Sequence, residues 1–339
     1  MSKTFQDNLN LLAVDSTLPT ASLYILSQMN KENLDIFRQT WPTFPLERRR
    51  TIMQNLVEIA EANFEVDFDP VFLLGLGDED GQVRALAIKS LWEYEHPNLI
   101  APLIHLLKTD PEAAVREASA STLGKFIYLR ELEEIDPNEA SLAEEALLET
   151  IYLTTEDINV RRRAIEAVSF SSDPRIAPII ETAYYHDNEQ MQVSAIFAMG
   201  RNADLVWLPR VIDELDNPNT EIRFEAARAC GELEAKDAVE KLVMLIDQDE
   251  DIEVQEMAIW SLGRIGGNIA REVLEACLEH ENDALAIAAE DAMEELNMFD
   301  SLVLYDMSEP IDLFDDDLDE LYSLDMDLPN GKNGDDYLH

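Results

Sequence analysis

The sequence predicts an all-α protein, an α-solenoid built from about seven helical hairpins. The main observation is a helical pattern that recurs at a nearly fixed spacing of about 31 residues. A fixed period of about 20 to 50 residues is typical of arrays in which one supersecondary unit stacks on the next. Composition agrees, because 46% of the 339 residues are hydrophobic and only 11 are glycine and 14 proline. Such a chain can form an extended core with few long irregular stretches.

The recurring helix is recognised by seven segments that align without gaps. Their first residues, defined here as position 0, follow one another at spacings of 32, 45, 31, 31, 32 and 31 residues. These first residues are Val83, Val115, Val160, Met191, Ile222, Val254 and Leu285. Position +4 is always Ala or Ser, and position +8 is apolar throughout. Positions 0, +4, +5 and +8 share one face of an α-helix, so we expect a buried stripe that lets a neighbouring helix approach closely.

A first helix precedes each of these second helices. Pro102, Pro178 and Pro209 all lie 13 residues before position 0, where proline is tolerated in the first turn of a helix. Short polar turns, such as Asp110-Pro111, separate the two helices. Asp and Asn in these turns can accept hydrogen bonds from backbone N–H groups and cap the second helix. Each unit is therefore predicted to be a helical hairpin.

One motif within the hairpin resembles a known repeat. Asp110 precedes Val115-Arg116 and Leu123-Gly124, and later units keep Cys230-Gly231 and Leu262-Gly263. This pattern resembles HEAT repeats, particularly the short bacterial kind named phycobilisome-lyase HEAT-like repeats. The resemblance implies a right-handed solenoid whose second helices line a concave side, and an arginine at +1, such as Arg161, that pairs with turn aspartates. It implies no single function, because lyases, adaptors and chaperone-like proteins share the repeat.

The resemblance covers residues 67–296 and divides the chain into three parts. Residues 1–66 contain helical patterns broken at Trp41-Pro42 and Phe44-Pro45, and we expect a helical cap on the first repeat. The 45-residue spacing indicates an insertion near 128–141 that lengthens one hairpin. Residues 297–339 form an acidic, largely disordered tail with Lys332 as its single basic residue. Within the tail, a short amphipathic helix is predicted at 309–322, with one apolar face formed by Ile311, Phe314, Leu318 and Leu321.

Charge and cysteine usage limit the partners and the compartment. The formal net charge is −46, so phosphate-bearing nucleic acid and anionic membranes are repelled, and basic protein segments are the natural partners. Simple solubility is the alternative reason for this charge. Cys230 and Cys277 lie within helical patterns without metal-ligand spacing and indicate a reducing compartment. We find neither a signal peptide nor a membrane span, and we expect a soluble, cytoplasmic protein.

Few residues suggest catalysis, and we expect no catalytic, metal or cofactor site. Di-iron enzymes with HEAT-like repeats need several His-Glu pairs, and only His280-Glu281 is present. Enzymes that hold DNA need a basic face, whereas Arg48-Arg49-Arg50 is isolated and is interpreted as a solvated helix face. Phosphate-binding glycine loops and nucleophile motifs are lacking as well.

A candidate binding surface follows from helical geometry. Positions +2, +6 and +10 of the second helices point away from the buried stripe, and the +6 and +10 rows each sum to zero charge. Residues 67–296 as a whole carry 18 basic and 50 acidic residues. The outward positions of three consecutive units contain Phe197, Arg201, Phe224, Arg228, Trp260 and Arg264. Aromatic and arginine side chains dominate binding hot spots, although each aromatic ring could instead pack against an adjacent helix.

The sequence therefore favours a non-catalytic scaffold or adaptor, chaperone-like, that binds a peptide or partner protein on its concave face. One alternative is an enzyme or accessory subunit of the bilin-lyase type. Another is an acidic mimic of nucleic acid that sequesters a basic protein. The tail is a solubilising segment, an intramolecular ligand whose apolar face docks on Phe197, Phe224 and Trp260, or a segment that binds another protein.

Overall fold

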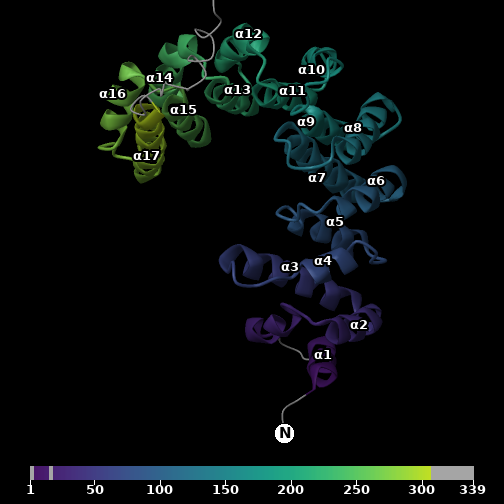
Figure 1. Cartoon of the computed structure of the whole chain (residues 1–339). Helices are drawn as coiled ribbons and strands as arrows, with labels where there is room; N and C mark the ends of the chain where they lie inside the picture. The colour runs from purple at the N-terminus through teal and green to yellow at the C-terminus, as the bar shows by residue number, and fades with distance from the viewer. Residues whose placement is uncertain (1–3, 15–17, 307–339) are drawn as a thin grey trace, which may run out of the picture. The chain divides into compact units, whose positions relative to one another are not determined.

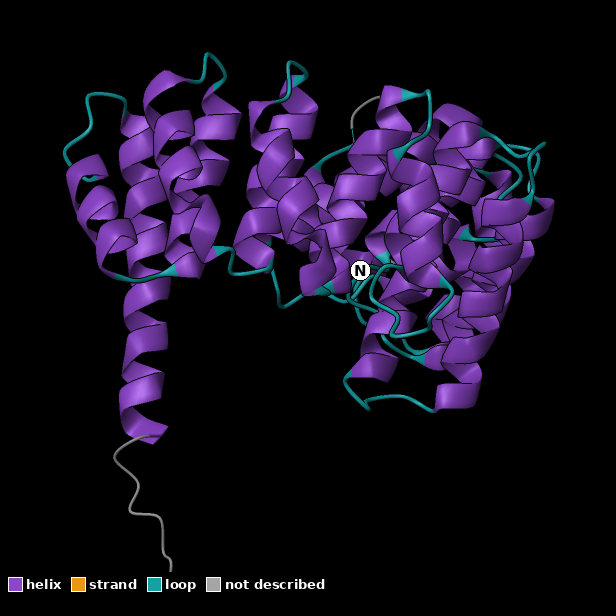
Figure 2. Ribbon diagram, turned by 90° about the horizontal axis from the view of Figure 1, so that it is seen from above, coloured by secondary structure: helices purple, strands orange, loops and turns teal. Residues whose placement is uncertain are grey.

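The computed structural model describes residues 4–14 and 18–306. Within these residues the chain forms helices and loops and no strand, which confirms the predicted all-α class (Figure 2). The chain divides into two compact units, Met1–Met293 and Glu294–His339. In the second unit the described residues are helical and form the end of a helix that begins in the first. No helix in the described part of the chain is long and apolar enough to cross a membrane.

In residues 4–14 and 18–66, the N-terminal part of the first unit forms three α-helices and two 3-10 helices. They are α1 (Phe5–Val14), η1 (Thr20–Leu26), α2 (Lys31–Thr40), η2 (Trp41–Thr43) and α3 (Leu46–Ala62). Trp41 lies at the centre, with its ring 5.3 Å from that of Phe37 and 5.7 Å from that of Phe44. Its indole Nε1 donates a 2.7 Å hydrogen bond to Asp78 Oδ2, in the turn of the first repeat. Since α3 also packs on a repeat helix, residues 1–66 join the array directly.

Seven helical hairpins follow along the chain. Their helices are α4 (Asp69–Gly75) and α5 (Gly81–Ser90), α6 (Ile100–Thr109) and α7 (Ala113–Glu131), α8 (Pro137–Tyr152) and α9 (Ile158–Val168), α10 (Ile176–Tyr184) and α11 (Glu189–Asn202), α12 (Leu208–Asp213) and α13 (Thr220–Glu232), α14 (Val239–Gln248) and α15 (Ile252–Ile265), and α16 (Asn268–Cys277) and α17 (Asp283–Asp306). The connecting 3-10 helices are η3 (Pro97–Leu99), η4 (Leu205–Trp207), η5 (Glu214–Asp216) and η6 (Lys236–Ala238). Each second helix from α7 to α13 packs on the second helix of the next hairpin (Figure 1).

The predicted apolar stripe is buried in the second helices α5 to α15, whereas in α17 Glu290 at +5 is exposed and Met293 at +8 is half-buried. Every side chain at position 0 is at most 3% exposed, and every residue at position +4 is fully buried. The close approach is clearest at position +9 of α7, where a Cβ built on Gly124 would lie 2.8 Å from the Cα of Ala167 on α9. Glycine there removes the side chain that would separate the two helices. The three prolines lie in the first turn of α6, α10 and α12, as predicted.

The residue at +1 connects five of the seven hairpins to their own turns. Arg84, Arg116 and Arg223 each donate from Nη1 to the backbone carbonyl six residues earlier, at 2.8 to 2.9 Å. Gln192 and Gln255 make the equivalent bond through Nε2. The expectation for Arg161 is wrong, because its Nε donates to the Ile151 carbonyl in the last turn of the long α8 instead of to a turn aspartate.

The same arginines also bridge to the following hairpin. Arg84 donates to both carboxylate oxygens of Asp110, from Nε to Oδ2 at 2.7 Å and from Nη2 to Oδ1 at 2.8 Å. Arg223 binds Asp249 at the same two distances. Bidentate pairs of this kind fix both distance and orientation. A ladder of arginine–carboxylate pairs therefore links successive turns.

The interpretation of Arg48-Arg49-Arg50 as a solvated face is wrong for its last two residues. Arg49 is 3% exposed and donates from Nη1 to both oxygens of Asp78, at 3.0 and 2.9 Å. Arg50 binds Asp80, the N-cap of α5, through Nε and Nη2. The cap thus uses arginines against the first turn much as the repeats do, although it lacks the repeat motif that would reveal them.

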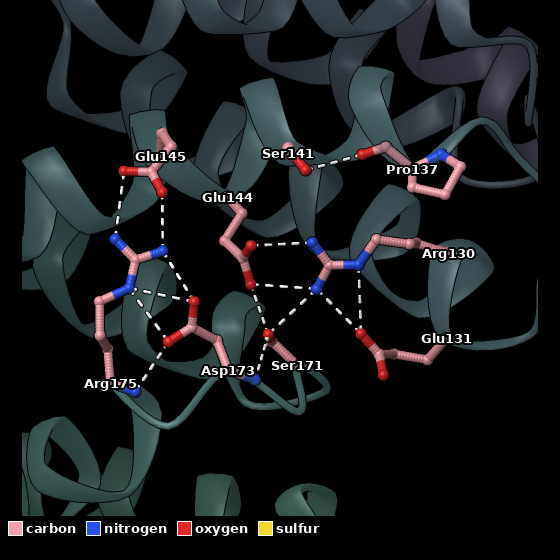
Figure 3. Close-up of polar contacts among 9 residues, drawn as sticks. All are labelled: Arg130, Glu131, Pro137, Ser141, Glu144, Glu145, Ser171, Asp173 and Arg175. Atoms are coloured by element: carbon pink, nitrogen blue, oxygen red, sulfur yellow. Dashed lines mark hydrogen bonds and ion pairs between the residues drawn. The ribbon is translucent and has the colours of Figure 1, made fainter.

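The insertion, which lies in the long helices α7 and α8, is held by a buried polar cluster. In this cluster Arg130, near the end of α7, donates to both carboxylate oxygens of Glu144 on α8, at 2.8 and 3.0 Å. Ser171, 1% exposed, accepts from Arg130 and donates to Glu144 (Figure 3). The pKa of Glu144 is held below its usual range, because the hydrogen bonds from Arg130 and Ser171 outweigh its large desolvation. The cluster is internally satisfied and joins three segments of the chain.

The tail prediction differs from the structure at its start. Residues 297–306, assigned to the tail from the sequence, continue α17 as helix. The helix predicted at 309–322, with Ile311, Phe314, Leu318 and Leu321, lies outside the described residues.

Candidate functional site

The six predicted surface residues lie on three neighbouring second helices. Phe197 and Arg201 are on α11, Phe224 and Arg228 on α13, and Trp260 and Arg264 on α15. Helix α13 packs against both α11 and α15, so the residues share one stretch of the first unit (Figure 1). The three aromatic side chains are half-buried, whereas Arg201 and Arg264 are exposed. We call these six residues the arginine–aromatic cluster.

Arg228 is the centre of the cluster and is only 8% exposed. Its guanidinium carbon lies 4.0 Å from the centroid of the Phe197 ring on the preceding helix. On its own helix it donates from Nε to Glu225 Oε2 at 2.7 Å and from Nη1 to Glu232 Oε1 at 2.8 Å. Burial and these two carboxylates commit Arg228 to internal contacts, so it holds the surface together instead of presenting a free charge.

Arg201 and Arg264 form the exposed part of the cluster. The guanidinium of Arg201 lies 5.6 Å from the rings of both Phe170 and Phe197, and its Nε is 3.1 Å from Glu232 Oε1. The guanidinium of Arg264 lies 5.9 Å from the Trp260 ring. These arginines therefore combine an aromatic support with an exposed guanidinium face, which is a preorganised arrangement.

Glycine makes room for the tryptophan. A Cβ on Gly231 of α13 would lie 2.8 Å from Cζ3 of Trp260. The indole of α15 therefore lies across the backbone of α13 and is not a freely solvated side chain. For Phe224, the structure shows a half-buried position at +2 of α13, one turn before Arg228.

Two carboxylates of the site were not singled out from the sequence. Glu225 and Glu232 are three residues before and four after Arg228, spacings at which helix neighbours interact, and this signal could have found them. Burial raises the pKa of both carboxyl groups, and the nearby arginines partly offset the shift. Glu232 Oε1 accepts a hydrogen bond from Arg228 and forms an ion pair with Arg201. The buried Oε2 of Glu232 accepts no hydrogen bond from the described residues.

The charged contacts continue toward the insertion as one strip. Arg163 of α9 lies between Glu117 of α7, at 3.3 Å, and Glu166, at 2.6 Å. Ser194 of α11 donates to Glu166 Oε1 at 2.6 Å and accepts from Arg162 at 2.9 Å. The strip contains five arginines and four glutamates, a formal charge of +1: Arg162, Arg163, Arg201, Arg228, Arg264, Glu117, Glu166, Glu225 and Glu232. It is nearly neutral in a region where acidic residues outnumber basic ones 50 to 18.

The strip and the adjoining cluster offer aromatic faces and guanidinium planes, side-chain types that are enriched at binding hot spots. Within residues 4–14 and 18–306, no three His, Cys, Asp or Glu side chains are arranged to hold a metal ion. Cys230 is fully buried and belongs to the core. This burial raises the pKa of its thiol to about 12.

Comparison with known proteins supports the fold class. A family model described as HEAT repeats matches residues 70–136 and 208–294. These two stretches of the chain therefore contain HEAT repeats, and the chain has the HEAT-like solenoid fold. No curated protein sequence matches it.

Several solved structures are similar to this chain. Yeast importin-beta (Kap95p) is 12% identical with a TM-score of 0.51, over 86% of this chain and 46% of that one. The complex of CpcE and CpcF of phycocyanin lyase from Nostoc sp. PCC7120 is 20% identical with a TM-score of 0.45, over 67% and 94%. Human deoxyhypusine hydroxylase is 16% identical with a TM-score of 0.35, over 79% and 96%. At 12% identity, the similarity to importin-beta shows the fold alone.

Proposed function

We propose that this HEAT-repeat chain is a non-catalytic scaffold that binds a protein or peptide partner on the face formed by α11, α13 and α15. One observation supports this most strongly: the arginine–aromatic cluster, with its three arginines and three aromatic rings, adjoins a nearly neutral strip in an otherwise strongly acidic repeat region. Arginine and aromatic residues are enriched at binding hot spots, and charged residues such as Glu and Asp are depleted there.

The contacts within the cluster favour binding for an entropic reason. Arg201 lies between the rings of Phe170 and Phe197 and against Glu232 before any partner arrives. A side chain that is already ordered loses little conformational freedom on association. The exposed guanidinium of Arg201 suits a carboxylate or backbone carbonyl of the partner, and the half-buried rings suit an apolar side chain.

We infer that the scaffold works in a reducing, cytoplasmic setting. Cys230 and Cys277 are both buried free thiols, and proteins of oxidising compartments more commonly pair such residues. The lyase alternative has no residue of the described chain to support it beyond the repeat itself. Only the net charge of −46 favours nucleic-acid mimicry. Binding by mimicry would be lost at high salt, whereas binding to the proposed surface would survive it.

The test is capture from native lysate with the tagged full chain, at low and high salt. We expect a partner that survives high salt and is lost when Arg201→Glu and Trp260→Ala are combined. The matched control is Met244→Ala on α14, an exposed apolar residue on a first helix, 53% exposed. A partner that leaves at high salt and binds both variants equally would instead support mimicry, and the proposed surface would then be wrong.

A further inference from the structure

A groove lies where the cap meets the first repeat, far along the chain from the arginine–aromatic cluster. It is bordered by the end of α3, the loop before α4, α4 itself and the end of α5, and its volume is about 750 Å³. Two aromatic side chains on its border are exposed, Phe64 at 89% and Trp92 at 65%. Phe64 is the most exposed large hydrophobic residue of the described chain, and Trp92 is the one exposed tryptophan of four. Single exposed apolar residues are normal, but two exposed aromatic rings that border one groove are candidates for an interaction site.

The charges along the groove are one-sided. Its lining contains four carboxylates, Glu61, Asp67, Asp69 and Glu93, and Lys89 as the single cation. Asp69 is half-buried, and its pKa is raised by burial and by the nearby charges of Asp67 and Glu93. Carboxylates crowded in this way repel one another, and a cation in the groove would relieve that repulsion.

Trp92 is held in place by a lysine from the next hairpin. Lys125 Nζ of α7 donates to the backbone carbonyls of Leu91, Trp92 and Tyr94, at 3.0, 3.0 and 2.5 Å. These bonds cap the residues after α5 and fix the backbone that carries the indole. Burial lowers the pKa of Lys125 to about 8, and its ammonium, which donates to these carbonyls, also interacts with the carboxylate of Asp69.

We propose that this groove binds a basic segment of a partner protein, with an arginine or lysine side chain between Phe64 and Trp92. The cation would face aromatic rings and the carboxylates of Glu61 and Glu93, and neighbouring apolar side chains would contact Val57 and Leu86. The acidic segment 297–339 does not suit the groove, because it has 13 acidic residues and one lysine. A second copy of the chain, with net charge −46, is also repelled. The site is separate from the arginine–aromatic cluster and its partner has the opposite charge preference.

The test measures binding of fluorescein-labelled synthetic peptides to the full chain by fluorescence anisotropy. One peptide alternates arginine and leucine, and its control alternates glutamate and leucine. At about 0.15 M salt, charges more than about 8 Å apart are largely screened, so general attraction to an acidic protein is reduced. We expect the arginine peptide to bind and the glutamate peptide not to bind.

Matched variants locate the site. Combining Phe64→Ala with Trp92→Ala should weaken the arginine peptide by about tenfold, the size of one desolvated cation–π contact. Combining Tyr152→Ala with Tyr185→Ala removes two equally exposed rings elsewhere, 64% and 67%, and should leave the affinity unchanged. Circular dichroism checks that each variant stays folded.

The charge contribution is tested in the same way. Glu61→Gln with Glu93→Gln should weaken binding more than Glu275→Gln with Glu279→Gln, which removes the same charge from exposed positions of the last hairpin. Equal effects of the two ring pairs or of the two glutamate pairs, or failure of the arginine peptide to bind, would overturn the proposal.

Discussion

At the residue scale, stability depends on arginine–carboxylate pairs between turns. The Asp249 side chain is 3% exposed, and it accepts from Arg223 twice and from the backbone N–H of Asp251. These hydrogen bonds hold the pKa of Asp249 below its usual range, and the bond from Arg223 contributes most to this shift. A carboxyl group whose pKa is lower in the folded than in the unfolded state stabilises the fold at pH values above its unfolded pKa. That contribution is lost as the pH falls through the pKa of the folded state.

We therefore expect Asp249→Asn to lower the free energy of unfolding by about 2 kcal/mol at pH 7, since a buried charge loses its partner. The difference from the native chain should shrink as pH falls below about 4, the ordinary range of an aspartate. Urea midpoints followed by circular dichroism measure it. Asp247→Asn, an exposed neighbour on α14, should change stability by less than about 0.5 kcal/mol at pH 7. A difference that stays constant down to pH 3 contradicts the role given to Asp249.

Some of these pairs follow from the sequence and others do not. Arg84 and Arg223 belong to the motif that implies pairing with turn aspartates, and both do so. Arg49 lies outside the repeats, so only the folded cap shows that it reaches Asp78. Arg161 has the motif but meets the Ile151 carbonyl, because the inserted residues lengthen α8 and change what lies beside it.

At the scale of the element, the close packing of α7 on α9 requires glycine at +9 of α7. A Cβ on Gly124 would lie 2.8 Å from Ala167 Cα and 3.1 Å from its carbonyl oxygen, and backbone atoms cannot move aside as a flexible side chain can. Alanine is a better helix former than glycine by about 1 kcal/mol, so the intrinsic preference opposes the packing cost.

We expect packing to dominate, and Gly124→Ala to destabilise the protein by about 2 kcal/mol through overpacking. The thermal midpoint measures this. Gly77→Ala is the control, because a Cβ there has only the Leu74 carbonyl oxygen nearby, at 3.8 Å, and should leave the midpoint unchanged or raise it slightly. An unchanged or higher midpoint for Gly124→Ala would show that α7 and α9 can separate at little cost.

Helix positions were largely predictable, because the repeat period, first-turn prolines and capping residues all agree. Asp80, Asn188, Asn219 and Asp251 accept from backbone N–H groups at the start of their helices, as turn chemistry implies. The continuation of α17 to Asp306 was not predicted, since it extends past the apolar repeat pattern. The Glu144 cluster was also missed, because its three polar residues come together only when the insertion folds.

At the scale of the whole molecule, charge is distributed unevenly along the array. The neutrality of the outward rows could be counted from the sequence, and it located the arginine–aromatic cluster. Counting could not reveal that Arg228 is buried, because in an array the +6 residue of one helix contacts the second helix of the hairpin before it, as Arg228 does with Phe197. The cluster is accordingly more rigid and less charged at its surface than six independent side chains would be.

The central claim is that a partner binds on the second helices, at α11, α13 and α15. Hydrogen exchange followed by mass spectrometry tests it most directly, comparing the full chain alone with the same chain in complex with its captured partner. We predict slower exchange in Glu189–Asn202, Thr220–Glu232 and Ile252–Ile265, where exposed backbone and side chains become covered. Slower exchange confined to the first helices α10, α12 and α14, with these three second helices unchanged, would contradict the claim.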